Sequence, residues 1–343
     1  MNRKTIFYLA NAPKNILFRG TGYLMPKQVV LSVTDHCNSK CKSCQIFSSQ
    51  PKLKALTSNE IYGVFSQPLF SKTELIINTG GETSLRSDLN EIFLAEHEAQ
   101  PQALLEVGTN GLLPGKIIEL AHFCKSKGIQ LEVGTSLSGV GEKHDENRGV
   151  LGNFDKVVYM LRELQKLNTI LVVGCVLTEY TADNIQELRK YLISQFGLEL
   201  VVQWCNESIY YNNKGVTGIS PQKTLEILNT LPDTPDNELW REYALGRSIR
   251  FPCYTLDTFM FIKCDGTVVP CLKLWDMGVG NLRNKSAAEI WHSQEAVKAR
   301  KVVKSCKGCL NSCAIQWSFS ATMYPYLKYY VKHPSRILKR LVR

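Results

Sequence analysis

Three cysteines near the amino-terminal end of the chain have the spacing of metal ligands. Cys37, Cys41 and Cys44 follow Gln28–Thr34, an apolar, β-branched run that predicts a buried strand. Three thiolates can bind three irons of a cubane cluster and leave the fourth iron without a protein ligand, which is the open position that a catalytic cluster needs. The alternative is a structural zinc site. Such sites usually close with four Cys or His ligands, and the nearest candidate, His36, stands directly beside Cys37, so the spacing favours iron–sulfur.

A second set of cysteines lies toward the carboxyl-terminal end: Cys253, Cys271, Cys306, Cys309 and Cys313. The sequence has 12 cysteines and no visible export signal, so clustered metal ligands explain these spacings better than disulfides do. A zinc ribbon is the alternative for this set. The four other cysteines stand alone, as buried apolar residues often do; they are Cys124, Cys175, Cys205 and Cys264. We assign Cys124 and Cys175 to packing.

The elements that must position these cysteines alternate between short strand-like runs and longer amphipathic stretches from residue 28 to residue 231. This pattern predicts an α/β fold of six βα units, a partial (β/α)6 barrel like a TIM barrel, with its chemistry at the carboxyl ends of the strands. The strands are expected at Gln28–Thr34, Glu74–Asn78, Ala103–Val107, Gln130–Ser136, Ile170–Leu177 and Leu198–Gln203. The helices are expected around Ser58–Phe65, Asp88–Glu98, Gly115–Lys127, Asn153–Lys166, Asn184–Gln195 and Pro221–Leu231.

Composition changes divide the chain further. We expect a basic amino-terminal arm (1–27), a core domain (28–231), a linker (232–250), a small Cys-rich β-hairpin and helix domain (251–317), and a basic aromatic tail (318–343). Asp265-Gly266 predicts a two-residue type I′ turn that pairs Cys264 with Thr267. That register would leave Cys264 roughly 13 Å along the ladder from the level of Cys271, too far to share a cluster.

Polar turns follow the predicted strands. Gly80-Gly81-Glu82-Thr83 ends the second strand, where two glycines let backbone approach a ligand closely and a carboxylate complements an ammonium group. Thr109-Asn110-Gly111 follows the third strand, and Ser136 ends the fourth. Arg148 lies shortly after the fourth strand and is a plausible partner for a carboxylate, or a brace for its own loop.

The cysteine loop and these turns resemble the motifs of the radical S-adenosylmethionine (SAM) superfamily. The resemblance implies that SAM chelates the open iron through its amino and carboxylate groups, and that an electron from this [4Fe–4S] cluster generates a 5′-deoxyadenosyl radical. It implies SAM contacts from Gly80, Gly81, Glu82, Thr83, Asn110, Ser136 and Arg148. Ser43, Thr83 and Ser138 depart from the residues common in the family at these positions, which leaves the adenine contact and the substrate class open.

The second cysteine set resembles the auxiliary-cluster domains called SPASM and, in a shorter form, twitch. A full SPASM domain has seven cysteines and holds two clusters, whereas this set has five, so we expect one auxiliary [4Fe–4S] cluster. By this resemblance its ligands are Cys253, Cys271, Cys306 and Cys309, with Cys313 the rival for the last place. A flavodoxin- or ferredoxin-type protein would supply the electrons.

The resemblance implies abstraction of a substrate hydrogen atom. We expect a two-electron oxidation assisted by the auxiliary cluster, with a redox-neutral epimerisation or C–C bond formation as the alternative. Cys205, after the sixth strand, could donate a hydrogen atom or could simply be a packed thiol. No additional amino-terminal domain for a leader peptide is visible. We therefore expect a carbohydrate-like or lipid-linked small molecule as substrate, with peptide maturation as the alternative.

The net charge of +10 lies at the two ends. Residues 1–27 and 323–343 carry five and six basic side chains and no acid, so the rest of the chain is nearly neutral. Apolar and aromatic residues accompany these charges, which suggests contact with an anionic membrane surface from the cytoplasmic side. A zinc-stabilised nucleic-acid-binding protein is a remote alternative, because no recognition module accompanies the basic residues.

Overall fold

The computed structural model describes residues 12–49, 53–205, 207–216, 219–247 and 252–306, together with Ser318, Ala321, Thr322, Tyr329 and Val331. Within these residues, no helix is long and apolar enough to cross a membrane.

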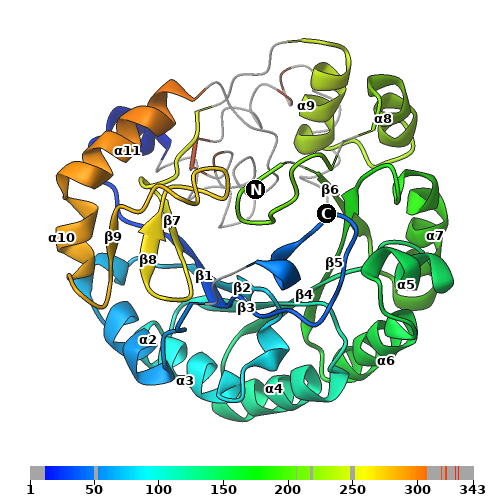
Figure 1. Ribbon diagram of the computed structural model, residues 1–343, viewed down its shortest axis with the longest axis horizontal. Helices are drawn as coiled ribbons and strands as arrows, with labels where there is room; N and C mark the ends of the chain where they lie inside the picture. Colours follow the sequence, from blue (N-terminus) through cyan, green and yellow to red (C-terminus); the bar gives the residue numbers. More distant parts are fainter. Residues whose placement is uncertain are drawn as a thin grey trace.

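Six parallel strands form the curved sheet at the centre of the molecule (Figure 1). Their order follows the sequence, so each strand pairs with the next one along the chain. The strands are β1 (Gln28–Thr34), β2 (Leu75–Gly80), β3 (Leu104–Thr109), β4 (Leu131–Ser136), β5 (Ile170–Leu177) and β6 (Leu200–Trp204). The predicted partial barrel of six βα units is confirmed.

Helices cover the outer face of this sheet and enclose the core between the two layers (Figure 1). The helices of this layer are α2 (Ser58–Phe65), α3 (Leu89–Ala99), α4 (Pro114–Lys127), α5 (Glu142–Arg148), α6 (Asn153–Lys166), α7 (Ile185–Phe196), α8 (Pro221–Leu228) and α9 (Pro235–Ala244). Short 3-10 turns lie at Ile46–Ser48, Pro68–Phe70, Thr83–Leu85 and Ala182–Asn184. Leu105 and Val107 of β3 pack in this core, so the alternate residues Glu106 and Gly108 face the inside of the barrel.

The interpretation of residues 232–250 as a linker missed helix α9. Thr234 caps this helix by accepting a hydrogen bond from the Asn237 amide, with proline at the first turn. Trp240 of α9 is buried and stacks on Trp204 of β6, with 4.3 Å between the ring centroids. The segment therefore packs against the barrel.

The carboxyl-terminal part continues the same sheet. Strand β7 (Phe259–Ile262) pairs in parallel with β1, and β8 (Thr267–Val269) and β9 (Gly280–Asn281) follow in antiparallel order (Figure 1). Helices α10 (Ala287–Trp291) and α11 (Gln294–Ser305) complete this part.

The predicted two-residue turn between β7 and β8 is wrong. Lys263, not Cys264, pairs with Thr267: its amide donates to the Thr267 carbonyl at 2.8 Å, and the Gly266 amide donates to the Lys263 carbonyl at 2.9 Å. Three residues therefore form the loop, and Gly266 has a φ of +88°. A glycine in that conformation closes a turn followed by a bulge, which an Asp-Gly pair also permits. Cys264 lies buried in this turn.

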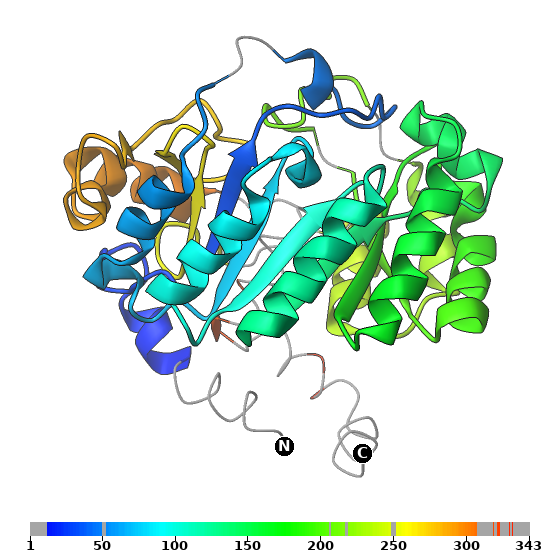
Figure 2. The ribbon, with the colours of Figure 1, turned by 90° about the horizontal axis from the view of Figure 1, so that it is seen from below.

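The described part of the amino-terminal arm is anchored to the carboxyl-terminal part of the chain. Trp291 donates its indole N–H to the Gly22 and Leu24 carbonyls at 3.2 and 3.0 Å, and the Asp257 carboxylate accepts from the Gly20 amide at 2.8 Å. Figure 2 shows the helical segment 12–17 at the end of the barrel opposite the loop that follows β1. The arm therefore lies far from the carboxyl ends of the strands.

One buried carboxylate predicts a pH-dependent stability. Burial raises the pKa of Glu96 from 4.5 to about 8, although a hydrogen bond from Asn78 at 2.7 Å acts in the opposite direction. Between these values only the unfolded state ionises, so stability falls by about 1.4 kcal/mol per pH unit as the pH rises. We expect Glu96→Gln to remove this loss. Its thermal midpoint should exceed that of the wild type increasingly from pH 5 to pH 8, whereas Glu98→Gln, an exposed change on the same helix, should follow the wild type. If the difference in thermal midpoint between Glu96→Gln and the wild type were the same at every pH, Glu96 would not be neutral in the folded protein.

Candidate active site

The Gly-Gly turn at the end of β2 packs directly against the start of the cysteine loop. The Gly81 amide donates to the Thr34 carbonyl at 2.8 Å, and the Glu82 amide donates to the His36 carbonyl at 2.7 Å. A Cβ on Gly80 would lie 2.1 Å from the Thr34 oxygen, and one on Gly81 would lie 2.1 Å from the His36 oxygen. Glycine is therefore required at both positions by the close approach of two backbone segments.

The three predicted cluster cysteines lie together on this loop. Cys41 is buried, Cys37 and Cys44 are half-buried, and the three thiols interact electrostatically with one another. Burial raises the pKa of Cys44 to about 12 and also raises the pKa of Cys37. Thiolates here consequently need a bound cation for stability. Among the described residues, no group of three or more His, Cys, Asp or Glu side chains has the arrangement to hold a single metal ion.

Glu82 joins the ends of β2 and β3. It is 1% exposed, and its Oε1 accepts hydrogen bonds from the Ser84 amide (3.1 Å), the Ser84 hydroxyl (2.5 Å) and the Thr109 hydroxyl (2.7 Å). Its Oε2 accepts from the Asn110 amide at 2.6 Å. Thr83 donates its hydroxyl to the Gly108 carbonyl at 2.8 Å. Glu82 and Thr83 thus hold the strand-three turn, and their contacts to SAM stay a prediction.

The other predicted SAM-binding residues lie around the same loop. The Asn110 side-chain amide donates a hydrogen bond to Oδ1 of Asn38 at 2.8 Å, and Asn38 lies between Cys37 and Cys41 in the sequence. The Ser136 carbonyl accepts a hydrogen bond from Arg148 Nη2 at 2.9 Å. Arg148 Nη1 donates to Cys41 Sγ at 3.5 Å. The structure therefore brings the turns after β2, β3 and β4 together with the cysteine loop.

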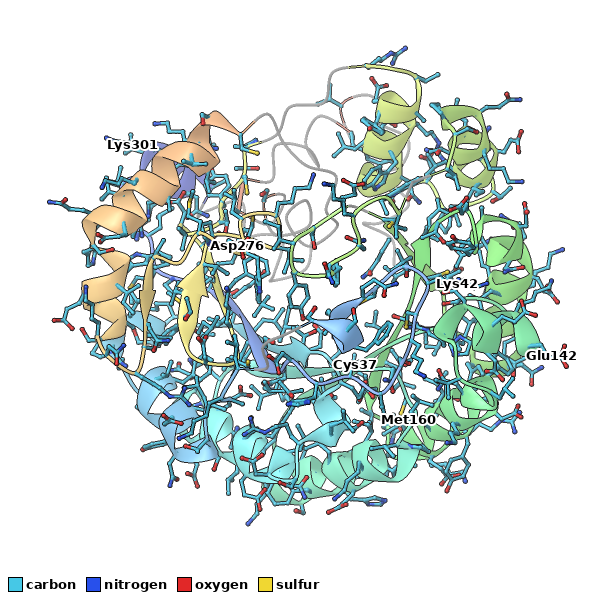
Figure 3. All side chains as sticks on the ribbon, viewed as in Figure 1. Cys37, Lys42, Glu142, Met160, Asp276 and Lys301 are labelled. Carbon is cyan, nitrogen blue, oxygen red and sulfur yellow. The ribbon has the colours of Figure 1, made fainter. Side chains whose placement is uncertain are left out.

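Helix α5, which the sequence did not predict, forms one wall of the site. Its last residues accept hydrogen bonds from the cysteine loop: the Lys40 amide donates to the Arg148 carbonyl and the Lys42 amide to the Asn147 carbonyl, both at 3.0 Å. Gly149 ends the helix with a φ of +65°, and a Cβ there would lie 2.8 Å from the Lys40 oxygen. Figure 3 shows the loop running from Cys37 past Lys42, with Glu142, the first residue of α5, at the outer rim.

The β6 loop, residues 207–216, was also missed. The Tyr210 hydroxyl donates to the Gly80 carbonyl at 2.9 Å, and the Tyr211 carbonyl accepts from the Gln45 amide at 2.8 Å. The Tyr210 amide donates to the Leu272 carbonyl at 3.4 Å, next to Cys271. Burial raises the pKa of Tyr210, so its hydroxyl stays protonated as this donation requires. The sequence offers only the pair Tyr210-Tyr211 after β6, and two adjacent aromatic residues do not by themselves indicate a functional site.

Cys205 lies beside this arrangement. The Asn213 side-chain amide donates to the Ser43 carbonyl at 3.3 Å and to Cys205 Sγ at 3.9 Å, which places Cys205 near the cysteine loop. Burial, followed by the Glu207 charge, raises the pKa of Cys205 and keeps it a neutral thiol. A hydrogen-atom donor needs that protonation state, and a packed thiol has it as well.

Two of the predicted auxiliary ligands, Cys253 and Cys271, pack against the same apolar cluster. The Thr255 hydroxyl, two residues after Cys253, donates to the carbonyl of Pro270, the residue before Cys271. Cys306 is exposed at the end of α11. Cys309 and Cys313 lie outside the described residues, as do residues 1–11 and 332–343 at the two ends of the chain. The complete auxiliary ligand set therefore stays a prediction.

The residues present fit an anionic iron–sulfur cluster. Arg148 brings a buried positive charge to Cys41, and its Nε has no hydrogen-bond partner within the described structure. Three thiolates around a cubane carry net negative charge, which a buried cation stabilises.

Comparison with known proteins agrees with this geometry. The family model of the radical SAM superfamily matches residues 31–192, and that of SPASM, an iron–sulfur cluster-binding domain, matches residues 253–310. The chain therefore belongs to the radical SAM superfamily and is an enzyme with a carboxyl-terminal SPASM domain. Its cofactors are SAM, the [4Fe–4S] cluster that binds SAM, and auxiliary iron–sulfur in the SPASM domain.

Individual relatives are distant. Sporulation killing factor maturation protein SkfB of Bacillus subtilis is 22% identical over 290 residues, covering 82% of this chain and 69% of that protein. AdoMet-dependent heme synthase of Methanosarcina barkeri is 22% identical over 315 residues, covering 84% of this chain and 88% of that protein. The solved structure of anSMEcpe with bound AdoMet has a TM-score of 0.65 and 17% identity, covering 92% of this chain and 99% of that chain, and it shows the same fold.

Proposed function

We propose that this radical SAM enzyme modifies a peptide by a net two-electron oxidation. When bound, SAM and its cluster would supply the abstraction of a hydrogen atom from the substrate, and the auxiliary cluster would accept one electron. Cys37, Cys41 and Cys44 would hold the SAM cluster, and the backbone of Gly80 and Gly81 would lie against SAM. A redox-neutral epimerisation or C–C bond formation, with Cys205 as hydrogen donor, is the alternative reaction.

The acidic inner face of the barrel supports the peptide substrate. Glu106 of β3 lies opposite Glu132 of β4, both on the face turned away from the helix layer. Burial, and then the Glu132 charge, raise the pKa of Glu106 to about 7. The name of the heme synthase indicates a tetrapyrrole, which carries anionic carboxylates. Glu106 and Glu132 would repel such a molecule, whereas they would tolerate a neutral or cationic peptide. The similarity to SkfB favours a peptide over the carbohydrate-like or lipid-linked molecule expected from the sequence.

The substrate class can be tested by SAM cleavage. The reconstituted enzyme would be incubated anaerobically with SAM, dithionite and either short peptides encoded beside its gene or an iron porphyrin with propionate groups. We expect a peptide to stimulate 5′-deoxyadenosine formation and to lose two hydrogens, measured by mass spectrometry. A peptide whose mass is unchanged after reaction in H2O, but which gains deuterium when the reaction is run in D2O, would identify the redox-neutral epimerisation. Stimulation by the porphyrin alone would reject the peptide proposal.

Glu82 provides a test of the SAM site. We expect Glu82→Ala to keep both kinds of cluster but to weaken SAM binding, because a charge-assisted contact contributes about 1.5–3 kcal/mol. The measurement is a SAM titration followed by electron paramagnetic resonance (EPR) of the reduced cluster. Ser84→Ala is the control, since it removes a hydrogen bond to the same carboxylate without removing its charge. Equal SAM affinity in Glu82→Ala would leave Glu82 with only its role of joining β2 and β3.

The auxiliary domain carries further proposals. We keep one auxiliary [4Fe–4S] cluster, held by Cys253, Cys271, Cys306 and either Cys309 or Cys313, with reduction by a flavodoxin- or ferredoxin-type protein. We also keep the division into a core domain and an auxiliary domain near residues 232–250, although a continuous sheet joins the two.

We further propose that the amino-terminal arm contacts an anionic membrane. Ile16 and Leu17 are 59% and 73% exposed, Tyr23 is 62% exposed, and Lys14 lies 5.4 Å from the Tyr23 ring centroid. Apolar, aromatic and basic side chains on one surface suit a lipid interface, where each cation contributes roughly 1 kcal/mol.

This membrane contact predicts selective sedimentation. We expect the protein to sediment with anionic liposomes at low salt and not with neutral liposomes. A variant carrying Ile16→Glu and Leu17→Glu, both exposed positions, should stay in the supernatant with either kind. Equal recovery of both proteins in the supernatant would reject the contact.

A further inference from the structure

Helix α5 ends on the central cysteine of the SAM cluster. The carbonyls of Asn147 and Arg148 accept the amides of Lys42 and Lys40, the residues on either side of Cys41. Gly149 turns the chain away in the left-handed conformation, which allows the Lys40 backbone to approach. The last side chain of the helix, Arg148, is therefore held next to the Cys41 sulfur by two backbone hydrogen bonds.

The guanidinium of Arg148 has an unusual environment. Nη1 donates to Cys41 Sγ at 3.5 Å and Nη2 donates to the Ser136 carbonyl at 2.9 Å, whereas the buried Nε has no partner among the described residues. No carboxylate in the described part of the chain pairs with it. Asp145, one turn earlier on α5, instead accepts from the Gly152 and Phe154 amides, at 2.6 and 2.8 Å.

We propose that Arg148 is a positioning residue that raises the reduction potential of the SAM cluster through Cys41. Reduction adds one negative charge to the cluster. A buried cation and an N–H···S hydrogen bond both stabilise the state with more negative charge on sulfur. This role differs from the expected contact between Arg148 and SAM, because it acts on the cluster before SAM binds.

The test is a redox titration without SAM, followed by EPR, in the reconstituted full-length enzyme. The relevant signal is the one that changes when SAM is added afterwards. In Arg148→Met we expect the ratio of reduced to oxidised cluster at a fixed potential to fall about tenfold, which corresponds to 59 mV for a one-electron couple. Arg148→Lys keeps the charge but loses the fork that reaches both Cys41 and Ser136, so its shift should be smaller and in the same direction.

Lys143→Met is the matched control. Lys143 lies on the same helix, but it is 52% exposed and pairs with Glu187 at 2.7 Å, so solvent screens its charge from the cluster. Its potential should equal that of the wild type. An unchanged potential in Arg148→Met or Arg148→Lys with full iron content overturns the proposal. If neither variant holds iron, Arg148 serves cluster assembly or folding, and the proposal is overturned as well. If SAM bound more weakly while the reduction potential stayed unchanged, Arg148 would act by contacting SAM, and the proposal would be overturned.

Discussion

Replacing Cys37, Cys41 and Cys44 together by alanine will remove about half of the bound iron and abolish 5′-deoxyadenosine formation. The reconstituted wild type should hold about eight irons as two four-iron clusters, one on this loop and one in the SPASM domain. The two predicted ligand sets lie on segments far apart in the sequence, so the auxiliary cluster should survive the loss of the first. The measurements are iron, sulfide and zinc content after anaerobic reconstitution, and product formation with dithionite.

Cys264→Ala is the control for this variant. Cys264 belongs to the carboxyl-terminal part but is buried in the turn between β7 and β8, and its carbonyl accepts the Leu56 amide at 2.7 Å. Its side chain should contribute no ligand, so iron content and activity should match the wild type. Stoichiometric zinc without iron in the wild type would contradict the cluster assignment. Persistent SAM cleavage in the triple variant would show that the loop does not hold the catalytic cluster.

The barrel could be predicted from the sequence because its strands are short apolar runs, rich in β-branched residues, between polar turns. Gln28–Thr34 and Ile170–Leu177 were predicted with the observed bounds, since a run of β-branched residues between polar turns has few other interpretations. Helix α5 could not be predicted in this way. Its seven residues, EKHDENR, contain no apolar position, and the buried ones are His144, Asp145 and Asn147. Its stability comes from polar contacts with the rest of the site, which periodicity does not detect.

The carboxyl-terminal part shows a different limit. The Asp-Gly signal located the hairpin, but not whether two or three residues form its loop, because both types accept glycine with a positive φ. Nor could the sequence show that β7 pairs with β1. That pairing joins residues more than two hundred positions apart, and it depends on how the whole barrel closes.

For the candidate site, too, local sequence motifs could be predicted, whereas contacts between distant segments could not. Cys37, Cys41, Cys44 and the Gly-Gly turn were recognisable because their spacing along the chain reflects the chemistry. The contact between Arg148 and Cys41 and the donation from Tyr210 to Gly80 join segments far apart in the sequence. Neither residue type is diagnostic by itself, so only the folded arrangement reveals that a helix end and the β6 loop hold the cysteine loop from two sides.

The close contact beneath the cysteine loop predicts the second large effect, that of Gly81→Ala. The new Cβ would lie 2.1 Å from the His36 oxygen, 2.4 Å from the His36 carbonyl carbon and 3.0 Å from the Cys37 nitrogen. All three are backbone atoms, which cannot rotate away as the end of a side chain can, so the segment that carries Cys37 must move. A displacement of about 1 Å in a catalytic arrangement can reduce the rate roughly a hundredfold. We expect 5′-deoxyadenosine formation to fall by about that factor, with partial loss of iron from the SAM cluster and a lower thermal midpoint.

Gly63→Ala separates this effect from that of adding a methyl group in general. Gly63 lies inside helix α2, and nothing stands within 4 Å of the Cβ that alanine would add. Alanine is favoured over glycine inside a helix by about 0.5–1 kcal/mol, so this variant should melt at a higher temperature and keep full activity. Iron content, EPR of the SAM cluster and product formation would be measured for both proteins. If Gly81→Ala retained wild-type iron and product formation, the Gly-Gly turn would not be what positions Cys37, and its glycines would serve only the exit from β2.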